Sequence, residues 1–83
     1  MKIITKIDKV DLFNIFLTFN GSEQRVLNLK DIISQFSTDS FVYKKLSDQS
    51  YFASVKLDSY GTLIWNNEID FCPDTLYENS KEI

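Results

Sequence analysis

The sequence predicts an α+β fold: two antiparallel β-hairpins form a mainly antiparallel sheet, with one short helix between the hairpins and one short C-terminal helix. Three observations support it. Apolar residues alternate with polar ones on both sides of turn residues, one stretch repeats apolar residues at helical spacing, and the only Pro precedes the last apolar residues. With 83 residues, the chain is expected to form a single domain, residues 1–83, with a small core.

The first strand is expected over residues 2–10, where the alternation is imperfect. Ile3, Thr5 and Ile7 fall on one side of an extended chain, whereas Ile4 and Val10 interrupt the pattern. We therefore expect a strand with one half-solvated face.

The clearest local signal is a hairpin over residues 12–29. Every second residue of the stretch 12–19 is apolar, namely Phe13, Ile15, Leu17 and Phe19. Asn20-Gly21 follows, and both residues tolerate the positive φ that a two-residue type I′ turn requires. Residues 23–29 resume the alternation, with Leu27 and Leu29 expected to face inward.

A short helix is predicted after this hairpin, because apolar residues recur at positions i, i+3, i+4 and i+7: Leu29, Ile32, Ile33 and Phe36. Asn28 is the expected N-cap. Residues 37–50 show no dominant period and are interpreted as a loop that packs a few apolar side chains. A helical turn is expected between residues 46 and 52, capped by Ser47 or Asp48.

The second hairpin is predicted from strands at residues 53–58 and 62–66, followed by the turn residues Asn66 and Asn67 and a short extended segment near Ile69. Pro73 suits the first position of a helix over residues 73–79, and Leu76 is expected to pack on the core. The last residues, 79–83, are expected to fray.

Composition excludes several functional classes. Nine basic and twelve acidic residues give a net charge of −3, which argues against direct binding of nucleic acid. One Cys and no His rule out an internal disulfide, His-dependent catalysis and His metal sites. No apolar run approaches the ~20 residues of a membrane span, and no signal-peptide pattern is present. We expect a cytoplasmic protein that has no cofactor and is not an enzyme.

Each residue that could take part in catalysis or ligand binding also has a structural interpretation. Cys72 is interpreted as an inert thiol near a helix start, because no His is present to act as its base. Glu68 and Asp70 share one side of an extended segment, with Asp74 close by. Capping is favoured over metal binding or acid–base work, and Asp70 is expected to accept backbone N–H bonds. Trp65 is expected in the core rather than as a stacking platform.

The best indication of function is a surplus of apolar side chains on faces expected to be exposed, notably Phe16, Ile64 and Tyr60. Either the sheet is covered on both sides or these residues belong to a contact surface. Adding polar residues of the neighbouring bend, the candidate interaction surface comprises Phe16, Ile64, Asn67, Glu68 and Asp70.

The C-terminal run GTLIWNNEIDFCPDTLY is similar to the pattern G-x-I-x-W-P-N-G-x-D-L-x-P-x-x-L-Y. By this run, the chain resembles the domain-of-unknown-function 2442 family. The matching positions are Gly61, Trp65, Asn67, Asp70, Pro73, Leu76 and Tyr77. Two positions depart from the pattern: Asn66 stands where the family usually has Pro, and Glu68 where it usually has Gly. If that Gly takes positive φ, either Glu68 is strained or the bend differs.

The resemblance implies a small bacterial module of unassigned biochemistry, which has been proposed to supply the antitoxin half of toxin–antitoxin pairs. It provides no catalytic residues. The preferred hypothesis is a non-enzymatic protein-interaction module with a small basic protein as partner, since the chain itself is acidic. Formation of a homodimer is kept as an alternative to this partner. The alternative is a small-ligand-binding or accessory domain with a pocket near Trp65.

Overall fold

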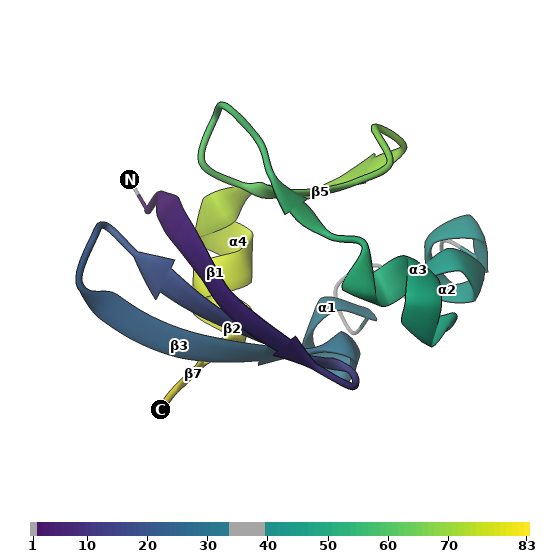
Figure 1. Cartoon of the computed structure of the whole chain (residues 1–83), viewed down its shortest axis with the longest axis horizontal. Coiled ribbons are helices and arrows are strands. Elements are labelled where there is room, and N and C mark those ends of the chain that lie inside the picture. The colour runs from purple at the N-terminus through teal and green to yellow at the C-terminus, as the bar shows by residue number, and fades with distance from the viewer. Residues whose placement is uncertain (1, 34–39) are drawn as a thin grey trace.

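The structure is a computed structural model that describes residues 2–33 and 40–83, and it confirms the α+β class. The predicted strands divide between two antiparallel sheets, a four-stranded sheet of order β1-β2-β3-β7 and a three-stranded sheet of order β4-β5-β6 (Figure 1). In chain order the described elements are β1 (Ile4–Asp11), β2 (Asn14–Phe19), β3 (Glu23–Asn28), α1 (Leu29–Ile33), α2 (Ser40–Leu46), α3 (Gln49–Ala53), β4 (Lys56–Leu57), β5 (Leu63–Trp65), β6 (Ile69–Asp70), α4 (Pro73–Asn79) and β7 (Lys81–Glu82).

Strand β1 contains two irregularities that change which side chains face the core. Its register against β2 shifts between Ile4 and Lys6 and again between Ile7 and Lys9, so each shift inserts one extra residue. Inward positions therefore recur at every third residue, Ile4, Ile7 and Val10. The expected grouping of Ile3 and Thr5 with Ile7 is wrong, because Ile3 and Thr5 are exposed whereas Ile4 is buried.

The hairpin of β2 and β3 is confirmed. Asn20 and Gly21 have φ values of 50° and 80°, and the Ser22 N–H donates to the Phe19 carbonyl at 3.1 Å, as the turn chemistry predicts. Strand pairing, however, begins with Phe19 opposite Glu23, so the connection has three residues rather than the two predicted. The alternating apolar residues of β2 lie in the core as expected.

The start of α1 is held by a reciprocal pair of side chains. The Lys30 N–H donates to Asn28 Oδ1 at 2.9 Å, and the Asn28 N–H donates to Asp31 Oδ2 at 3.0 Å. The prediction of Asn28 as N-cap is confirmed. Ile32 is buried as the helical spacing predicts, whereas the predicted continuation to Phe36 lies outside the described residues.

Helices α2 and α3 correct the predicted loop where it overlaps the described chain. Residues 40–46 form α2, with Val42 and Leu46 buried one turn apart. Two buried apolar residues one turn apart are too few to establish a helical period in the sequence. The predicted helical turn is α3, and Asp48 rather than Ser47 caps it by accepting from the N–H groups of Ser50 and Tyr51. No helix in residues 2–33 and 40–83 is long and apolar enough to cross a membrane.

The second hairpin is confirmed, with a later start than predicted. Ala53, the first residue of the predicted strand, still belongs to α3, Ser54 is the C-cap of that helix, and β4 begins at Lys56. Strand β5 pairs with β4 on one side and β6 on the other, so the expected extended segment at Ile69 is also confirmed. Helix α4 begins at Pro73, and Leu76 is buried as predicted.

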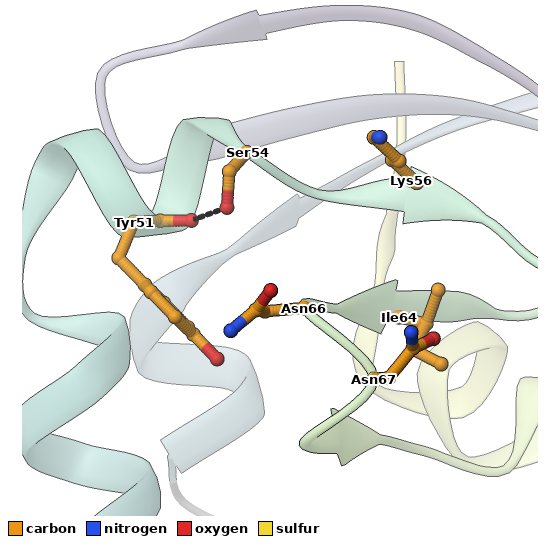
Figure 2. A pocket seen from close by; sticks show the side chains of 6 residues that line it. All are labelled: Tyr51, Ser54, Lys56, Ile64, Asn66 and Asn67. Atoms are coloured by element: carbon orange, nitrogen blue, oxygen red, sulfur yellow. Dashed lines mark hydrogen bonds between the residues drawn. The ribbon is translucent and has the colours of Figure 1, made fainter.

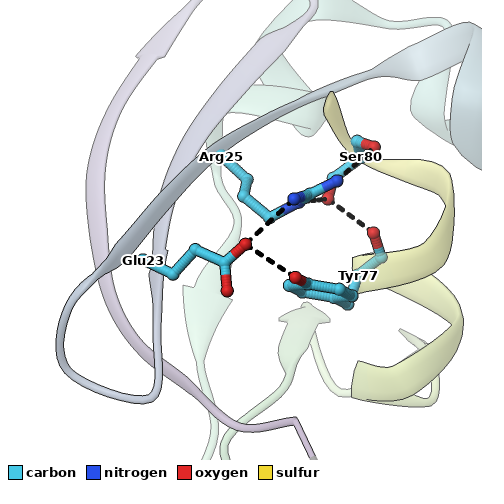
Figure 3. A network of polar contacts seen from close by, with 4 residues as sticks. All are labelled: Glu23, Arg25, Tyr77 and Ser80. Carbon is cyan, nitrogen blue, oxygen red and sulfur yellow. Dashed lines mark hydrogen bonds and ion pairs between the residues drawn. The ribbon is translucent and has the colours of Figure 1, made fainter. Parts of the chain in front are cut away.

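The end of the chain is ordered rather than frayed, which corrects the prediction for residues 79–83. Strand β7 pairs with the open edge of β3, and Ser80 is buried. Figure 3 shows the contacts that hold this end: Arg25 Nε donates to Ser80 Oγ at 2.6 Å, and the Tyr77 hydroxyl donates to Glu23 Oε2 at 2.6 Å. The Arg25 guanidinium also lies 4.2 Å from the centre of the Tyr77 ring.

Trp65 lies at the centre of the core, as predicted, with an exposed fraction of 0%. Its ring centre is 6.0 Å from that of Phe52 and 5.7 Å from that of Phe71. The indole Nε1–H donates to the Phe52 carbonyl at 2.9 Å, so the polar atom of the side chain is satisfied inside the core. One side chain thereby joins α3, β5 and the segment before α4.

We expect replacement of Trp65 by Ala to lower the free energy of unfolding by about 3–5 kcal/mol, because it removes a fully buried aromatic side chain. That loss is comparable with the total stability of about 5 kcal/mol expected for so small a domain. Urea denaturation followed by circular dichroism measures the change. Tyr60→Ala is the control, since Tyr60 is 84% exposed and its loss should change stability by less than ~0.5 kcal/mol. Equal stability of both variants would contradict the core assignment.

Substitution of two glycines with the same backbone conformation distinguishes the cost of backbone strain from the cost of steric overlap. Gly61 and Gly21 have φ values of 78° and 80°, but a Cβ on Gly61 would collide with the Ile3 side chain, whereas one on Gly21 has no atom within 4 Å. We expect Gly21→Ala to cost about 1 kcal/mol and Gly61→Ala about 1–2 kcal/mol more, measured by the same denaturation. Equal costs would show that Ile3 moves aside freely.

Candidate functional site

The structure separates the residues of the predicted interaction surface into two groups. Phe16 lies on the outer face of the four-stranded sheet, because it is adjacent to the buried Ile15 and Leu17 in β2. Ile64 and Asp70 lie on the three-stranded sheet, and Asn67 and Glu68 on the turn that joins β5 to β6. Four of the five predicted residues therefore come together, and Phe16 belongs to a different surface.

The outer face of the three-stranded sheet carries one row of three side chains. Register places Lys56 opposite Ile64 and Ile64 opposite Asp70, so all three point to the same side. The neighbours of Ile64 along β5, Leu63 and Trp65, are fully buried on the other side. Ile64 is only half-buried, which leaves part of its apolar surface open between two charged residues.

The turn beside this row has an unusual backbone. Asn66 and Asn67 have φ values of 52° and 56°, and the Glu68 N–H donates to the Trp65 carbonyl at 2.9 Å. Asn tolerates this left-handed conformation, and Pro at position 66 could not adopt it because its ring holds φ near −65°. Glu68 itself is not among the residues with positive φ, so its backbone is not strained, and the left-handed positions of the turn are Asn66 and Asn67.

A hollow of about 310 Å³ lies between the turn, α3 and the small sheet. Figure 2 shows its lining: Tyr51 and Ser54 from α3, Lys56 from β4, Ile64 from β5, and Asn66 and Asn67 from the turn. Tyr51 and Ser54 were not predicted as site residues. A signal was available, because the Asp48 cap fixes where α3 begins and the i, i+3 spacing then places both side chains on one side of it.

One polar contact closes the rim of the hollow. The Tyr51 hydroxyl donates to Glu68 Oε2 at 2.8 Å and lies 3.3 Å from the Trp65 carbonyl oxygen. Burial raises the pKa of Tyr51 to about 12, and the hydrogen bond and charge of Glu68 add to the shift. The same hydrogen bond is the main reason that the pKa of Glu68 is lowered, with Asn66 and Lys45 contributing.

The neighbouring carboxylates differ in their contacts. Asp74 accepts from the Lys2 N–H at 2.7 Å. The expectation that Asp70 caps backbone N–H groups is wrong, since Asp70 lies exposed on β6 and no described N–H group donates to its side chain. Among the described residues, no three His, Cys, Asp or Glu side chains are grouped as metal ligands. Cys72 is exposed at the N-cap of α4 and makes no capping bond.

The hollow offers hydrogen-bond donors around an apolar side chain. Lys56 and the amides of Asn66 and Asn67 can donate hydrogen bonds around the apolar Ile64 side chain. The Ser54 hydroxyl already donates to the Tyr51 carbonyl at 2.5 Å. Such a hollow can receive one side chain of another protein or one small polar molecule.

Comparison with protein-family models matches residues 4–82 to the family described as protein of unknown function, DUF2442. The match spans nearly the whole chain and includes the row, the turn and the hollow. No curated protein and no solved structure matches the chain.

We expect Tyr51→Phe to raise the pKa of Glu68 toward its ordinary value of 4.5, because the hydrogen bond that chiefly lowers it is lost. Titration of the side-chain carboxyl carbons by NMR measures this shift. Tyr43→Phe is the control, since Tyr43 is 54% exposed on α2. Because the folded-state pKa is lowered, the stabilisation from Glu68 is present above about pH 4.5 and is lost as pH falls through the folded-state value. A wild-type Glu68 that titrates at or above 4.5 would contradict this contact.

Proposed function

The chain belongs to the DUF2442 family of proteins of unknown function, and we propose that it is a non-enzymatic protein-interaction module that binds its partner through the outer face of the three-stranded sheet. The row of Lys56, Ile64 and Asp70 is the observation that supports this proposal. An apolar centre with charged residues on both sides is the composition of a protein contact, in which the centre excludes water and the rim sets orientation.

The partner is a small basic protein. Glu68 and Asp70 are both exposed beside the hollow, and the whole chain carries a net charge of −3. Long-range attraction to a basic surface would speed the encounter and favour one orientation. An antitoxin-like role, in which this chain pairs with a basic toxin, is the specific form of this proposal.

Two features would hold such a partner. The hollow would take one side chain against Ile64, with hydrogen bonds from Asn66 and Asn67. Strand β6 is the last strand in its sheet, and its outer edge has no paired strand in residues 2–33 and 40–83. An extended segment of the partner could add to that edge through backbone hydrogen bonds.

A second candidate function is binding of a small anionic molecule in the same hollow. Lys56 and two Asn residues line it, and a volume of about 310 Å³ is at the small end of ligand sites. In this alternative, the pocket predicted near Trp65 is this hollow. It lies beside the Trp65 backbone and not against the Trp65 ring, because the ring is fully buried. An NMR titration with a panel of small carboxylates and phosphates tests this alternative, with shifts expected at Lys56 and Asn67.

We expect Ile64→Asp to abolish binding of a basic partner, and Glu68→Lys combined with Asp70→Lys to weaken it at least about tenfold, because these changes remove the apolar centre and reverse the local charge. A tagged chain purified from its native host, followed by light scattering of the complex, measures both stoichiometry and mass. The control is Leu12→Asp in the β1–β2 turn, where Leu12 is 69% exposed with φ of 54°.

A stoichiometric basic partner that is retained by the control and lost by Ile64→Asp would support the proposal. A monomer or a homodimer with no second protein would contradict it and would move the small-ligand alternative forward. A partner bound equally by all variants would place the contact elsewhere on the molecule.

A further inference from the structure

A second row of outward side chains crosses all four strands of the larger sheet. Register places Lys9 opposite Phe16, Phe16 opposite Val26, and Val26 opposite Lys81. Directly paired residues point to the same side of a sheet, so the row reads Lys, Phe, Val, Lys from β1 to β7. It contains Phe16, the one predicted surface residue that the small sheet does not include.

The centre of this row is apolar and hollowed on two sides. Phe16 and Val26 are half-buried, so part of each side chain is open to solvent. A hollow of about 310 Å³ is lined by Phe16 together with Ile83, which is 69% exposed. Another of about 370 Å³ is lined by Val26 together with Lys30. An apolar side chain placed over the Phe16–Val26 pair would therefore gain contact surface on both sides.

The two ends of the row are cationic in a chain whose net charge is −3. Lys9 and Lys81 are exposed, and neither forms an ion pair with a described residue. The Lys9 ammonium instead lies 4.7 Å from the centre of the Phe16 ring. A carboxylate from another molecule is the natural partner for such a lysine.

The carboxylates on this side of the sheet are largely engaged. Asp8 Oδ2 accepts from the Thr18 hydroxyl at 2.8 Å, and Asp8 Oδ1 lies 3.8 Å from the Lys6 ammonium. Asp31 accepts from the Asn28 N–H, and Asp11 lies at the end of β1. The Lys6 ammonium offsets the charge of Asp8, and Lys30 shares a hollow with Asp31, so Lys9 and Lys81 add positive charge beyond these pairs.

We propose that this row is a second docking surface, which binds an extended acidic peptide segment of a partner protein. Three strand spacings separate the ends of the row by about 14 Å. In an extended peptide, residues four apart are about 13 Å apart, and residues i, i+2 and i+4 point to one side. The segment therefore carries carboxylates at i and i+4 over Lys9 and Lys81, and a bulky apolar residue at i+2 over the Phe16–Val26 pair.

This surface differs from the face of the three-stranded sheet in position and in charge. The Lys56–Ile64–Asp70 face is proposed to attract a basic partner through Glu68 and Asp70, whereas the Lys9–Lys81 row attracts an acidic segment. The two proposals rest on different residues, so failure of one leaves the other to stand on its own observations.

The test is an NMR titration of the full-length, ¹⁵N-labelled chain with the blocked peptide Gly-Glu-Ser-Phe-Ser-Glu-Gly at low salt. Shifts are expected at Lys9, Phe16, Val26 and Lys81. A peptide of identical composition, Gly-Ser-Glu-Phe-Glu-Ser-Gly, places its carboxylates two residues apart and is expected to bind about tenfold more weakly. Binding of the first peptide is also expected to weaken as salt rises, because exposed charges are screened.

Charge reversal identifies the contact. Lys9→Glu combined with Lys81→Glu is expected to weaken binding of the first peptide at least about tenfold. Lys44→Glu combined with Lys45→Glu is the matched control, because both residues lie on α2, neither lines the row or its hollows, and the change in net charge is the same. The control is expected to change the affinity less than about threefold.

Several outcomes would overturn the proposal. They are the absence of shifts along the row at millimolar peptide, equal binding of the two peptides, and equal loss of affinity in the two double variants. Tighter binding of a ten-residue oligothymidine than of the peptide, with shifts at the same residues, would also overturn it and would assign the row to single-stranded nucleic acid.

Discussion

The hydrogen bond from the Trp65 indole to the Phe52 carbonyl is the contact on which the rest of the structure depends. It fixes α3 against β5 while the Trp65 ring fills the core between Phe52 and Phe71. Because α3 is held in this place, the Tyr51 hydroxyl can reach Glu68. Tyr51 and Ser54 of α3 then line one side of the hollow. The candidate site is therefore a consequence of how the core is packed, and its Tyr51 side chain packs directly against that core.

Both sheets bury one face and leave the other open, which is the expected result for a chain of 83 residues with a small core. Each open face carries an apolar centre between charged residues. On the small sheet the row ends in Asp70 beside Glu68, and on the larger sheet the row has Lys9 and Lys81 at its ends. The acidic chain thus offers two faces with different electrostatic character, and these support two separate binding proposals.

Much of the local structure could be predicted, because its signals lie within a few residues of one another. Asn20 and Gly21 form the turn between β2 and β3, Asn28 caps α1, and Pro73 begins α4. The phase of β1 could not be predicted, since its two bulges are stabilised by contacts across strands, such as the bond from Thr18 to Asp8. The ordered C-terminus was missed for a similar reason: β7 is held by β3 and Arg25, which are distant in sequence.

By itself, the sequence determined the fold class, the turns, the caps and the burial of Trp65, because each follows from local backbone preferences or from apolar periodicity. Only the tertiary structure decided which strands share a sheet, that Tyr51 and Ser54 join Ile64 and Asn67 around one hollow, and that Phe16 lies on another surface. These groupings depend on register and on packing between segments far apart in the chain. Such long-range contacts are selected by the energy of the whole core, and no short stretch of residues encodes them.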